Sequence, residues 1–453
     1  MTSERIPFPQ QIESRPELVE RFGDLHTPLD RQVATVEANR CLYCFDAPCT
    51  IACPTHIDVP RFIKKIASGN LAGSAYTILD ANILGASCSR ACPVEVLCEG
   101  ACVMNHVNKQ PIEIAALQRF AMDSFYASGA PLPFEPGVET GRKVALIGAG
   151  PASLACAAEL RRQGVQADIY DARPLPGGLN SYGVAEYKLP LVESLREIEM
   201  LAQLGVNVHF HTVIGAAELA GLEKDYDGIF LGIGLGAIHK LGIAGEELAG
   251  VTNALDLIAG YKAGTVTEAP ARVAVVGAGN TAIDAAIAAV RLGATEVHIL
   301  YRRGPEEMSA FQFEYEHARR EGVKFLWHVQ PVEVRGEGRV EAIALRRLVV
   351  TDEESVVAQA GSEFVLETDM VVMSIGQSTH SGFVAGDEGR AAKVRTERGR
   401  IVIDRATGQT SDPRYFAGGD CTNGGREVVD AVADGKRAGV GMAAWLEGQH
   451  VRA

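Results

Sequence analysis

Long apolar runs and an excess of positive charge are both missing from this sequence. Its longest apolar stretches are interrupted by glycines and by acids such as Glu159 and Asp284. None reaches the roughly 20 residues that cross a membrane. The 43 Lys and Arg residues are outnumbered by 57 Asp and Glu residues, a formal net charge of −14. Because nucleic acid requires a basic surface, we expect neither a nucleic-acid nor a membrane partner.

Cysteine is almost absent outside one block of the chain. Only Cys156 and Cys421 lie outside residues 41–102, which contain the other eight. The first ten residues, Met1–Gln10, lack the apolar core of a signal peptide, so a secreted disulfide framework is not expected. A reducing, cytoplasmic location is predicted instead, because it keeps thiolates free.

The clustered cysteines follow short spacings: Cys41-x2-Cys44-x4-Cys49-x3-Cys53-Pro54 and Cys88-x3-Cys92-Pro93-x4-Cys98-x3-Cys102. Such spacings, with Pro after Cys53 and Cys92, are typical of loops that hold [4Fe-4S] clusters. Structural zinc is the alternative, since paired cysteines also suit a tetrahedral site. The three-residue gaps and the Cys-Pro pairs favour iron–sulfur clusters, and therefore single-electron transfer.

With 453 residues the chain is long enough for about three domains. Residues 16–128 predict helices and irregular segments, with apolar residues at helical spacing in Pro60–Ser68 and Ile112–Tyr126. The Gly- and Pro-rich segment Gly129–Arg142 predicts a linker. Beyond it the pattern changes to alternating strands, glycine turns and helices.

That pattern occurs twice. Lys143–Ile147 predicts a strand followed by the turn Gly148-Ala-Gly150, and Arg272–Val276 one followed by Gly277-Ala-Gly279. In such a turn the second glycine lets backbone N–H groups approach a pyrophosphate at the helix N-terminus. A small residue, Ser153 or Ala282, replaces the third glycine. We therefore predict two Rossmann-like dinucleotide-binding domains, with helices over Leu154–Gln163 and Ile283–Arg291.

The residues after each second strand separate the two ligands. Asp171 ends the second strand of the first unit, and an acid there hydrogen-bonds a free ribose 2′-OH, which predicts FAD. In the second unit Arg302 and Arg303 take this place. Guanidinium groups favour a 2′-phosphate, so the second site predicts NAD(P)H with a preference for NADPH. A solvated loop is the alternative for these two arginines.

The C-terminal part predicts that the chain returns to the first dinucleotide-binding domain after it has formed the second. Arg414–Asp420 predicts a strand that runs into a Gly-Gly-Asp turn, with a helix from about Glu427. Gly419 and Asp420 are expected at the ribityl or pyrophosphate groups of FAD. The predicted fold class is α/β: an N-terminal α-helical iron–sulfur domain and two Rossmann-like domains, the second inserted into the first. The predicted ranges are 1–130 for the clusters, 140–255 and 385–453 for FAD, and 256–384 for NAD(P).

Five motifs carry a resemblance that covers nearly the whole chain: Asp46-Ala-Pro-Cys49, Cys53-Pro-Thr, Asn82-Ile-Leu-Gly85, Cys92-Pro-Val-Glu-Val-Leu-Cys98-Glu-Gly and Leu117-Gln118-Arg119-Phe120. With them the sequence resembles the electron-input subunit of bacterial NAD-dependent dihydropyrimidine dehydrogenase and the N-terminal half of the eukaryotic enzyme. It is less closely similar to the small subunit of glutamate synthase.

The resemblance implies a division of the cluster ligands. Cys41, Cys44, Cys49 and Cys102 would hold one [4Fe-4S] cluster, and Cys53, Cys92, Cys98 and the side-chain oxygen of Gln118 the other. Cys88 is then a spare thiol. The alternative is that Cys88, in place of Gln118, completes an all-cysteine site.

Motif and resemblance together give the expected cofactor-binding residues, with Gly178, Leu179, Lys188 and the Ser374–Gly376 turn resting on the resemblance alone. For FAD they are Gly148, Gly150, Pro151, Ala152, Ser153, Asp171, Gly178, Leu179, Lys188, Gly419 and Asp420. For NAD(P)H they are Ala278, Gly279, Asn280, Thr281, Arg302, Arg303, Ser374, Ile375 and Gly376.

The resemblance implies an electron relay from NAD(P)H through FAD and two [4Fe-4S] clusters to an FMN-containing partner that reduces uracil or thymine. We expect a hetero-oligomer, a heterotetramer, and no acid–base catalytic residue in this chain. The alternatives are a glutamate synthase small subunit or a related flavin-based transhydrogenase, and a non-catalytic scaffold that retains its cofactors. The nicotinamide part contains no Cys-x-x-Cys pair, which argues against a thioredoxin-reductase-like function.

Overall fold

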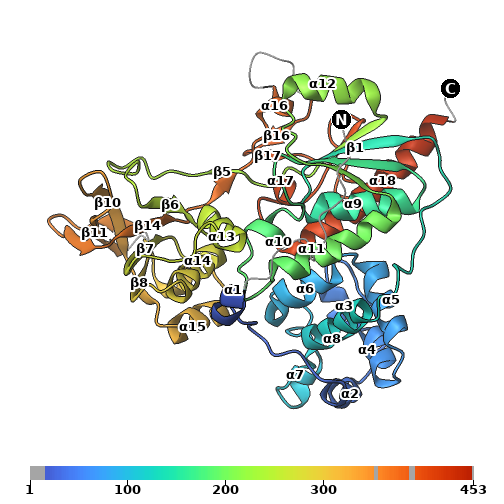
Figure 1. The fold of residues 1–453 in the computed structure, drawn as a ribbon, viewed down its shortest axis with the longest axis horizontal. Helices are drawn as coiled ribbons and strands as arrows, with labels where there is room; N and C mark the ends of the chain where they lie inside the picture. Colours follow the sequence, from blue (N-terminus) through green and yellow to red (C-terminus); the bar gives the residue numbers. More distant parts are fainter. Residues whose placement is uncertain (1–15, 351–355, 387–392, 451–453) are drawn as a thin grey trace.

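The computed structural model of this chain describes residues 16–350, 356–386 and 393–450. The expectation for Met1–Gln10 lies outside these residues. Three lobes are visible in Figure 1: a helical lobe from the N-terminal part and two lobes that each contain a parallel sheet. The predicted architecture, a helical N-terminal region followed by two Rossmann-like units with the second inserted into the first, is confirmed.

The N-terminal lobe contains helices and irregular loops, and no strand occurs in its described residues before Lys143. Apolar residues at helical spacing form its core; Phe62 and Ile66 of α4 are buried against α8, for example. Asp58 caps α4 by accepting a hydrogen bond from the backbone N–H of Arg61. The elements are α1 (Pro16–Arg21), α2 (Arg31–Asn39), α3 (Pro48–Ala52), α4 (Val59–Ala67), α5 (Leu71–Ala81), α6 (Gly85–Ala91), the 3-10 helix η2 (Val94–Val96), α7 (Met104–Val107) and α8 (Ile114–Ala127).

The first sheet contains five parallel strands in the order β18-β4-β1-β2-β3. They are β18 (Tyr415–Ala417), β4 (Gly228–Leu231), β1 (Lys143–Ile147), β2 (Gln166–Tyr170) and β3 (Asn207–His209). Because β18 comes from the C-terminal part, the chain returns to this sheet after building the second one. Helix α18 (Val428–His450) then lies beside α9 (Pro151–Arg162), as Figure 1 shows.

The second sheet has the parallel order β6-β14-β7-β8-β9. Its strands are β6 (Val251–Asn253), β14 (Met370–Met373), β7 (Arg272–Val276), β8 (Glu296–Leu300) and β9 (Lys324–Leu326), flanked by α13 (Ala254–Ala263), α14 (Asn280–Arg291), η4 (Pro305–Glu307) and α15 (Gln312–Arg320). An antiparallel unit extends from it, with β10 (Val329–Arg335), β11 (Ala342–Val350), β12 (Val356–Ala358) and β13 (Phe364–Glu367). Strand β6 belongs to this second sheet, although its residues fall inside the range 140–255 that is predicted for the FAD-binding domain. The exact domain boundaries stay a prediction.

Two short strands, β5 (Ala237–Ile238) and β15 (Gln377–Ser378), pair antiparallel where the chain passes between the two sheets. The remaining elements are α10 (Leu179–Tyr182), α11 (Leu191–Glu199), η3 (Met200–Leu204), α12 (Ala216–Asp225), α16 (Gly382–Ala385), β16 (Thr396–Glu397), β17 (Arg400–Ile401) and α17 (Asp420–Asn423). The predicted linker Gly129–Arg142 forms neither helix nor strand. Within the described residues, no helix has the length and apolar character needed to span a bilayer.

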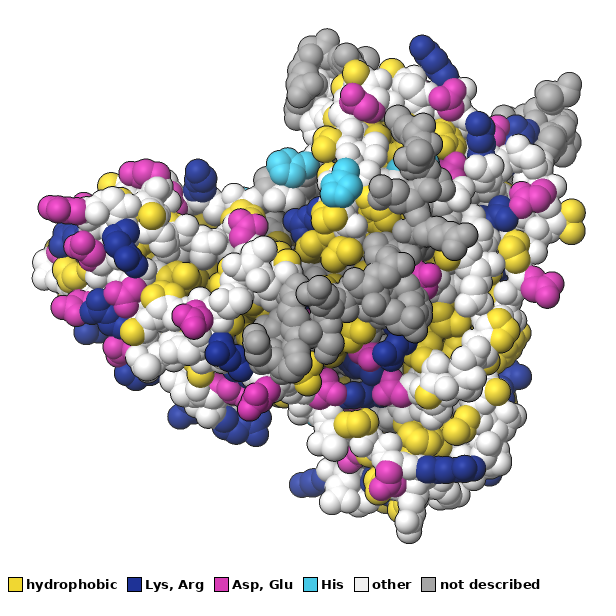
Figure 2. All heavy atoms as spheres, in the orientation of Figure 1, with side chains coloured by type: hydrophobic (Ala, Val, Ile, Leu, Met, Phe, Trp, Pro, Cys, Tyr) yellow, Lys and Arg dark blue, Asp and Glu magenta, His cyan; other side chains and the backbone are white. Residues whose placement is uncertain are grey.

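The surface carries both signs of charge. On the face shown in Figure 2, Lys and Arg side chains are interspersed with Asp and Glu side chains over the lobe that contains β7, β8, β10 and β11. Mixed charge of this kind is typical of a solvated surface and does not select a polyanionic ligand.

Candidate active site and cluster sites

The first glycine turn lies at the C-terminal edge of β1, where Gly148 and Gly150 present backbone and no side chain. Gly148 has φ = 92°, and a Cβ there would lie 2.5 Å from the carbonyl oxygen of Gly232. The backbone of Gly178 also approaches that of Gly150 closely. Helix α9 begins at Pro151, immediately after this turn. The free N–H groups of its first turn are therefore available as donors of the kind that bind a pyrophosphate.

Asp171 lies directly after β2, beside this turn. Its Oδ2 accepts a hydrogen bond from the backbone N–H of Ala149 at 2.6 Å, and its Oδ1 accepts one from that of Arg173 at 2.7 Å. Burial raises the pKa of Asp171 above its ordinary value. The carboxylate is thus fixed next to the glycine turn, where a ribose of a dinucleotide would bind.

The C-terminal Gly-Gly-Asp turn contacts the same region. Gly419 lies against the side chain of Ala152 in the first turn of α9. Asp420 begins α17, and its Oδ1 accepts a hydrogen bond from the backbone N–H of Arg426 at 3.2 Å. Burial raises the pKa of Asp420. Residues from the two separate segments of the FAD part, one before and one after the nicotinamide part, therefore lie next to each other.

The second glycine turn repeats this construction. Gly277 has φ = 123°, and a Cβ there would lie 2.1 Å from the carbonyl oxygen of Ser374. Only glycine fits, and this close approach sets the Ser374–Gly376 turn beside the start of α14. Asn280, the first residue of α14, accepts a hydrogen bond at Oδ1 from the backbone N–H of Phe311 at 3.0 Å.

Arg302 and Arg303 follow β8 but have different surroundings. Arg302 lines the large cavity described below. Arg303 is 44% exposed, with Nε 3.9 Å from Oε1 of Glu307. Of the two, the structure brings only Arg302 to the cavity.

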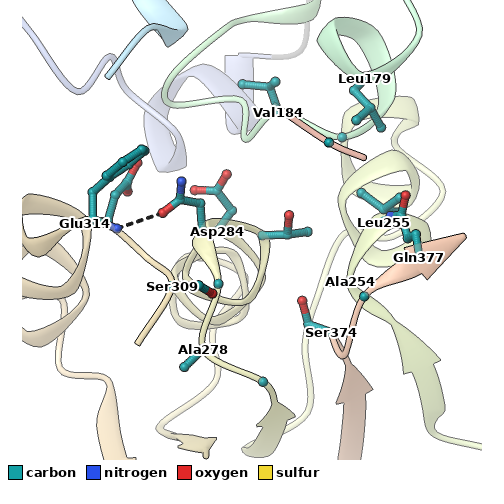
Figure 3. Close-up of a pocket in the computed structure, with 18 of the residues that line it drawn as sticks. Leu179, Val184, Ala254, Leu255, Ala278, Asp284, Ser309, Glu314, Ser374 and Gln377 are labelled. Atoms are coloured by element: carbon teal, nitrogen blue, oxygen red, sulfur yellow. Dashed lines mark hydrogen bonds between the residues drawn. The ribbon is translucent and has the colours of Figure 1, made fainter. Parts of the chain in front are cut away.

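A cavity of 1210 Å³ lies between the three lobes. Figure 3 shows Asp284, Glu314 and Ser309 on one side of it, and Leu179 and Val184 across from them. It brings together these residues expected from sequence: Leu179, Lys188 and Asp420 from the FAD set, Ala278, Gly279, Asn280, Thr281, Arg302, Ser374, Ile375 and Gly376 from the nicotinamide set, and Cys92 from the cluster set. The other expected residues lie outside its lining: Gly148, Gly150, Pro151, Ala152, Ser153, Asp171, Gly178, Gly419 and Arg303, and the cluster ligands Cys41, Cys44, Cys49, Cys53, Cys98, Cys102 and Gln118.

Lys188 forms a buried ion-pair group in this cavity. Its Nζ lies 2.7 Å from Oδ1 of Asp284 and 2.5 Å from Oε1 of Glu314. All three side chains are less than a tenth exposed. Burial alone would lower the pKa of Lys188, but the charges of Asp284 and Glu314 raise it, so the ammonium is retained. Burial raises the pKa of Glu314 to about 7.

Sequence reasoning did not single out these two carboxylates. Asp284 has a local signal, because it is the one acid of α14 and lies within a run of buried apolar residues. Glu314 has none, since α15 also contains an exposed acid, Glu316. A third acid, Glu427, lines the cavity as well, and burial raises its pKa to about 7.

Cys41, Cys44, Cys49 and Cys102 line one small pocket together with Ile63 and Ile114. Their thiols are close enough to interact electrostatically, as Cys49 does with Cys41 and Cys102. Burial raises the pKa of Cys49 to about 12. Four thiols around an apolar pocket are a suitable donor set for a [4Fe-4S] cluster.

The second group contains Cys53, Cys92 and Cys98, whose thiols also interact with one another. The neighbouring Cys88 thiol is the largest cause that raises the pKa of Cys92. Gln118 is buried, and its Nε2 donates a hydrogen bond to the carbonyl oxygen of Gly85 at 2.6 Å. Within the described residues, no group of three or more His, Cys, Asp or Glu side chains is arranged to hold a single metal ion. A cubic cluster instead binds its thiolates on different irons.

Comparison with known proteins agrees with this geometry. Residues 142–435 match the pyridine nucleotide-disulphide oxidoreductase family, and residues 18–130 match dihydropyrimidine dehydrogenase domain II, 4Fe-4S cluster. The fold and the site define an electron-transfer oxidoreductase that uses flavin, iron–sulfur clusters and a pyridine nucleotide. The chain belongs to the pyridine nucleotide-disulphide oxidoreductase family. Its cofactors are FAD, [4Fe-4S] clusters and NAD(P)H, which fit the two glycine turns and the two cysteine groups.

Two relatives match over nearly their whole length. The chain is 34% identical to the glutamate synthase [NADPH] small chain of Escherichia coli K12, covering 94% of each chain. It is 33% identical to the NAD-dependent dihydropyrimidine dehydrogenase subunit PreT of Salmonella typhimurium, covering 93% of this chain and 95% of that one. The resemblance found in the sequence is thereby confirmed. Mycobacterium tuberculosis FprA in complex with NADPH shares the fold, with a TM-score of 0.55 and 20% identity over 69% of this chain and 86% of that chain.

Proposed function

We propose that this chain is the electron-input subunit of a dihydropyrimidine dehydrogenase. It takes hydride from NAD(P)H onto FAD and passes electrons through two [4Fe-4S] clusters to an FMN-containing partner that reduces uracil or thymine. The observation that carries the relay within this chain is one continuous cavity: Ala278 of the nicotinamide turn, Leu179 of the flavin set and Cys92 of the cluster set all line it.

Each part of the chain has a binding role in this proposal. FAD supplies the conversion of a hydride into single electrons when it is bound. Residues at the first glycine turn and at Asp171 and Asp420 bind FAD, and those at the second turn and Arg302 bind the nucleotide. The cluster held by Cys53, Cys92, Cys98 and Gln118 is nearest the flavin, because Cys92 lines the cavity.

The other cluster is placed for electron exit. Its ligands Cys41 and Cys44 lie in a loop that also contains Leu42 and Phe45, which are 58% and 100% exposed, and Cys49 follows in α3. We place the two cysteine groups in this order, cavity side first and surface side second. The exposed loop then lies toward the partner in a hetero-oligomer, for which we propose a heterotetramer.

A second candidate is the small subunit of glutamate synthase, or a related flavin-based transhydrogenase. The 34% identity to the glutamate synthase small chain favours it as much as the PreT identity favours the first. The relay within this chain would be the same, and only the terminal acceptor would differ.

Anaerobic co-purification of this chain with its native partner tests both candidates. The complex is assayed for NAD(P)H oxidation driven by uracil, and separately by 2-oxoglutarate plus glutamine. Uracil-dependent oxidation with FMN in the eluate supports the first candidate, and oxidation only with 2-oxoglutarate and glutamine supports the second. A flavin that does not bleach under NAD(P)H would leave the scaffold alternative.

A matched pair of variants separates relay from flavin reduction. Cys102→Ala removes a proposed ligand of the exit cluster, so it should abolish oxidation coupled to the partner and leave flavin bleaching intact. Cys156→Ala is the control, because Cys156 is equally buried but lies in α9, away from both cysteine groups. It should retain both activities.

A further inference from the structure

The segment 183–190, between α10 and α11, belongs to the FAD part of the chain but packs into the nicotinamide part. Ala185 and Tyr187 are 0% and 1% exposed, and they share one hydrophobic cluster with residues of α13 and α14 such as Tyr261 and Ile283. This segment, the wedge, therefore belongs to one dinucleotide-binding unit and packs into the hydrophobic core of the other.

Polar contacts fix the backbone of this segment. The ammonium of Lys262, on α13, donates hydrogen bonds to the carbonyl oxygens of Val184 at 2.9 Å and Leu189 at 2.7 Å. The hydroxyl of Tyr187 donates to Oδ1 of Asp284 at 2.7 Å. These buried contacts hold the two ends of the segment, and Lys188 lies between them.

Lys188 links this segment to two of the carboxylates that line the cavity. It pairs with Asp284 on α14 and Glu314 on α15, two helices of the nicotinamide part. Figure 3 shows Asp284 and Glu314 directed into the same space. Without the ammonium, Asp284 and Glu314 would be two neighbouring buried acids that lack this counter-charge, so one of them would have to bind a proton or move away from the other.

Helix α14 transmits the effect of this pairing to the nucleotide site. Asp284 lies one helical turn after Asn280, the residue at which α14 begins beside the second glycine turn. A shift of Asp284 would therefore move the helix N-terminus that faces the pyrophosphate of the nucleotide.

We propose that Lys188 is a positioning residue that joins the two dinucleotide sites. It holds α14 and α15 against the FAD part, so that the nicotinamide nucleotide binds in the correct position relative to the flavin. This inference rests on the proposed hydride-transfer function. It differs from the direct flavin contact that the resemblance implied for Lys188, because the ammonium is already paired with Asp284 and Glu314.

The test uses the anaerobic, FAD- and cluster-loaded chain. Dissociation constants for NADP⁺ and NAD⁺ are measured by titration calorimetry, and flavin retention by the temperature at which FAD fluorescence is released. Lys188→Met should raise the Kd of the tighter-binding nucleotide about tenfold, within the usual range for coupled sites. Lys188→Arg should recover most of the loss.

A charge swap provides the decisive variant. The double substitution Lys188→Glu with Glu314→Lys keeps the three charges but exchanges their places, so it should bind nucleotide at least threefold more tightly than Lys188→Met. The control is Lys436→Met: Lys436 also bridges two lobes, donating to the carbonyl oxygen of Asp80 at 2.6 Å, but it lies outside this cavity. It should keep the wild-type Kd.

Two results would overturn the inference. One is a wild-type nucleotide Kd in Lys188→Met. The other is that Lys188→Met and the charge swap raise the nucleotide Kd equally and also lower the FAD release temperature. That outcome is expected if Lys188 binds the flavin directly. A wild-type chain that binds neither NADP⁺ nor NAD⁺ would overturn the proposed function as well.

Discussion

Gln118 donates a hydrogen bond from Nε2 to the carbonyl oxygen of Gly85 at 2.6 Å, and this contact orients its amide. Because the carbonyl oxygen of Gly85 can only accept a hydrogen bond, the amide nitrogen of Gln118 must point toward it. The amide oxygen of Gln118 then points away from Gly85. Within the described residues no donor bonds to that oxygen. We therefore propose that this oxygen binds an iron of the cluster held by Cys53, Cys92 and Cys98.

Gln118→Cys should lower the midpoint potential of that cluster. A thiolate adds one negative charge where the amide is neutral, which disfavours reduction, on the order of 100 mV for a change of ligand type. An anaerobic redox titration followed by electron paramagnetic resonance measures it, and the exit cluster in the same sample is the internal control. An unchanged or higher midpoint would contradict the assignment of Gln118.

Cys88→Ala decides between the two candidate ligands by iron content. If Gln118 is the fourth ligand, the variant keeps both clusters and about eight irons per chain. Iron and sulfide analysis checks it, and a fall to about four irons would show that Cys88 is the ligand.

Local patterns in the sequence were sufficient for the two glycine-turn units. The predicted strands Lys143–Ile147 and Arg272–Val276 match β1 and β7 to the residue, because each is an apolar run bounded by a basic residue and a glycine. The following helices begin three residues earlier than predicted, at Pro151 and Asn280. The small residues taken for the turn form the first turn of each helix.

Contacts between distant segments could not be predicted in the same way. Lys188 lies in a loop, and its partners Asp284 and Glu314 belong to helices of the other dinucleotide-binding unit. No periodicity or motif relates these positions, since their approach depends on how the wedge at 183–190 packs. The same holds for the antiparallel strand β11, whose partners β10 and β13 are set by tertiary packing.

Glu197→Gln should flatten the pH dependence of stability. Glu197, on α11, accepts hydrogen bonds from the backbone N–H groups of Ala86 at 2.6 Å and Ser87 at 2.9 Å, so it ties the FAD part to α6. Burial raises the pKa of Glu197 to about 7 from 4.5. The folded chain thus holds this proton more tightly than the unfolded chain does.

The sign follows from that difference. The stability contributed by the protonated acid is fully present below pH 4.5 and is lost as the pH rises through about 7. Between these values the free energy of unfolding of the wild type should fall by up to roughly 3 kcal/mol more than that of Glu197→Gln. Anaerobic urea unfolding at several pH values measures both, and parallel curves would contradict the prediction.

Arg302→Ala and Arg303→Ala form a matched pair for the choice of nucleotide. Arg302 lines the cavity, whereas Arg303 faces Glu307 and solvent, so only the first is placed to contact a 2′-phosphate. A charge-assisted contact of this kind contributes about 1.5–3 kcal/mol, which corresponds to roughly a 10- to 150-fold change. The ratio of kcat/KM for NADPH to that for NADH, measured by anaerobic flavin reduction, should fall by this factor in Arg302→Ala and by less than threefold in Arg303→Ala. Equal losses in the two variants would mean that both guanidinium groups reach the phosphate, and no loss in either would mean that the nucleotide bound here lacks one.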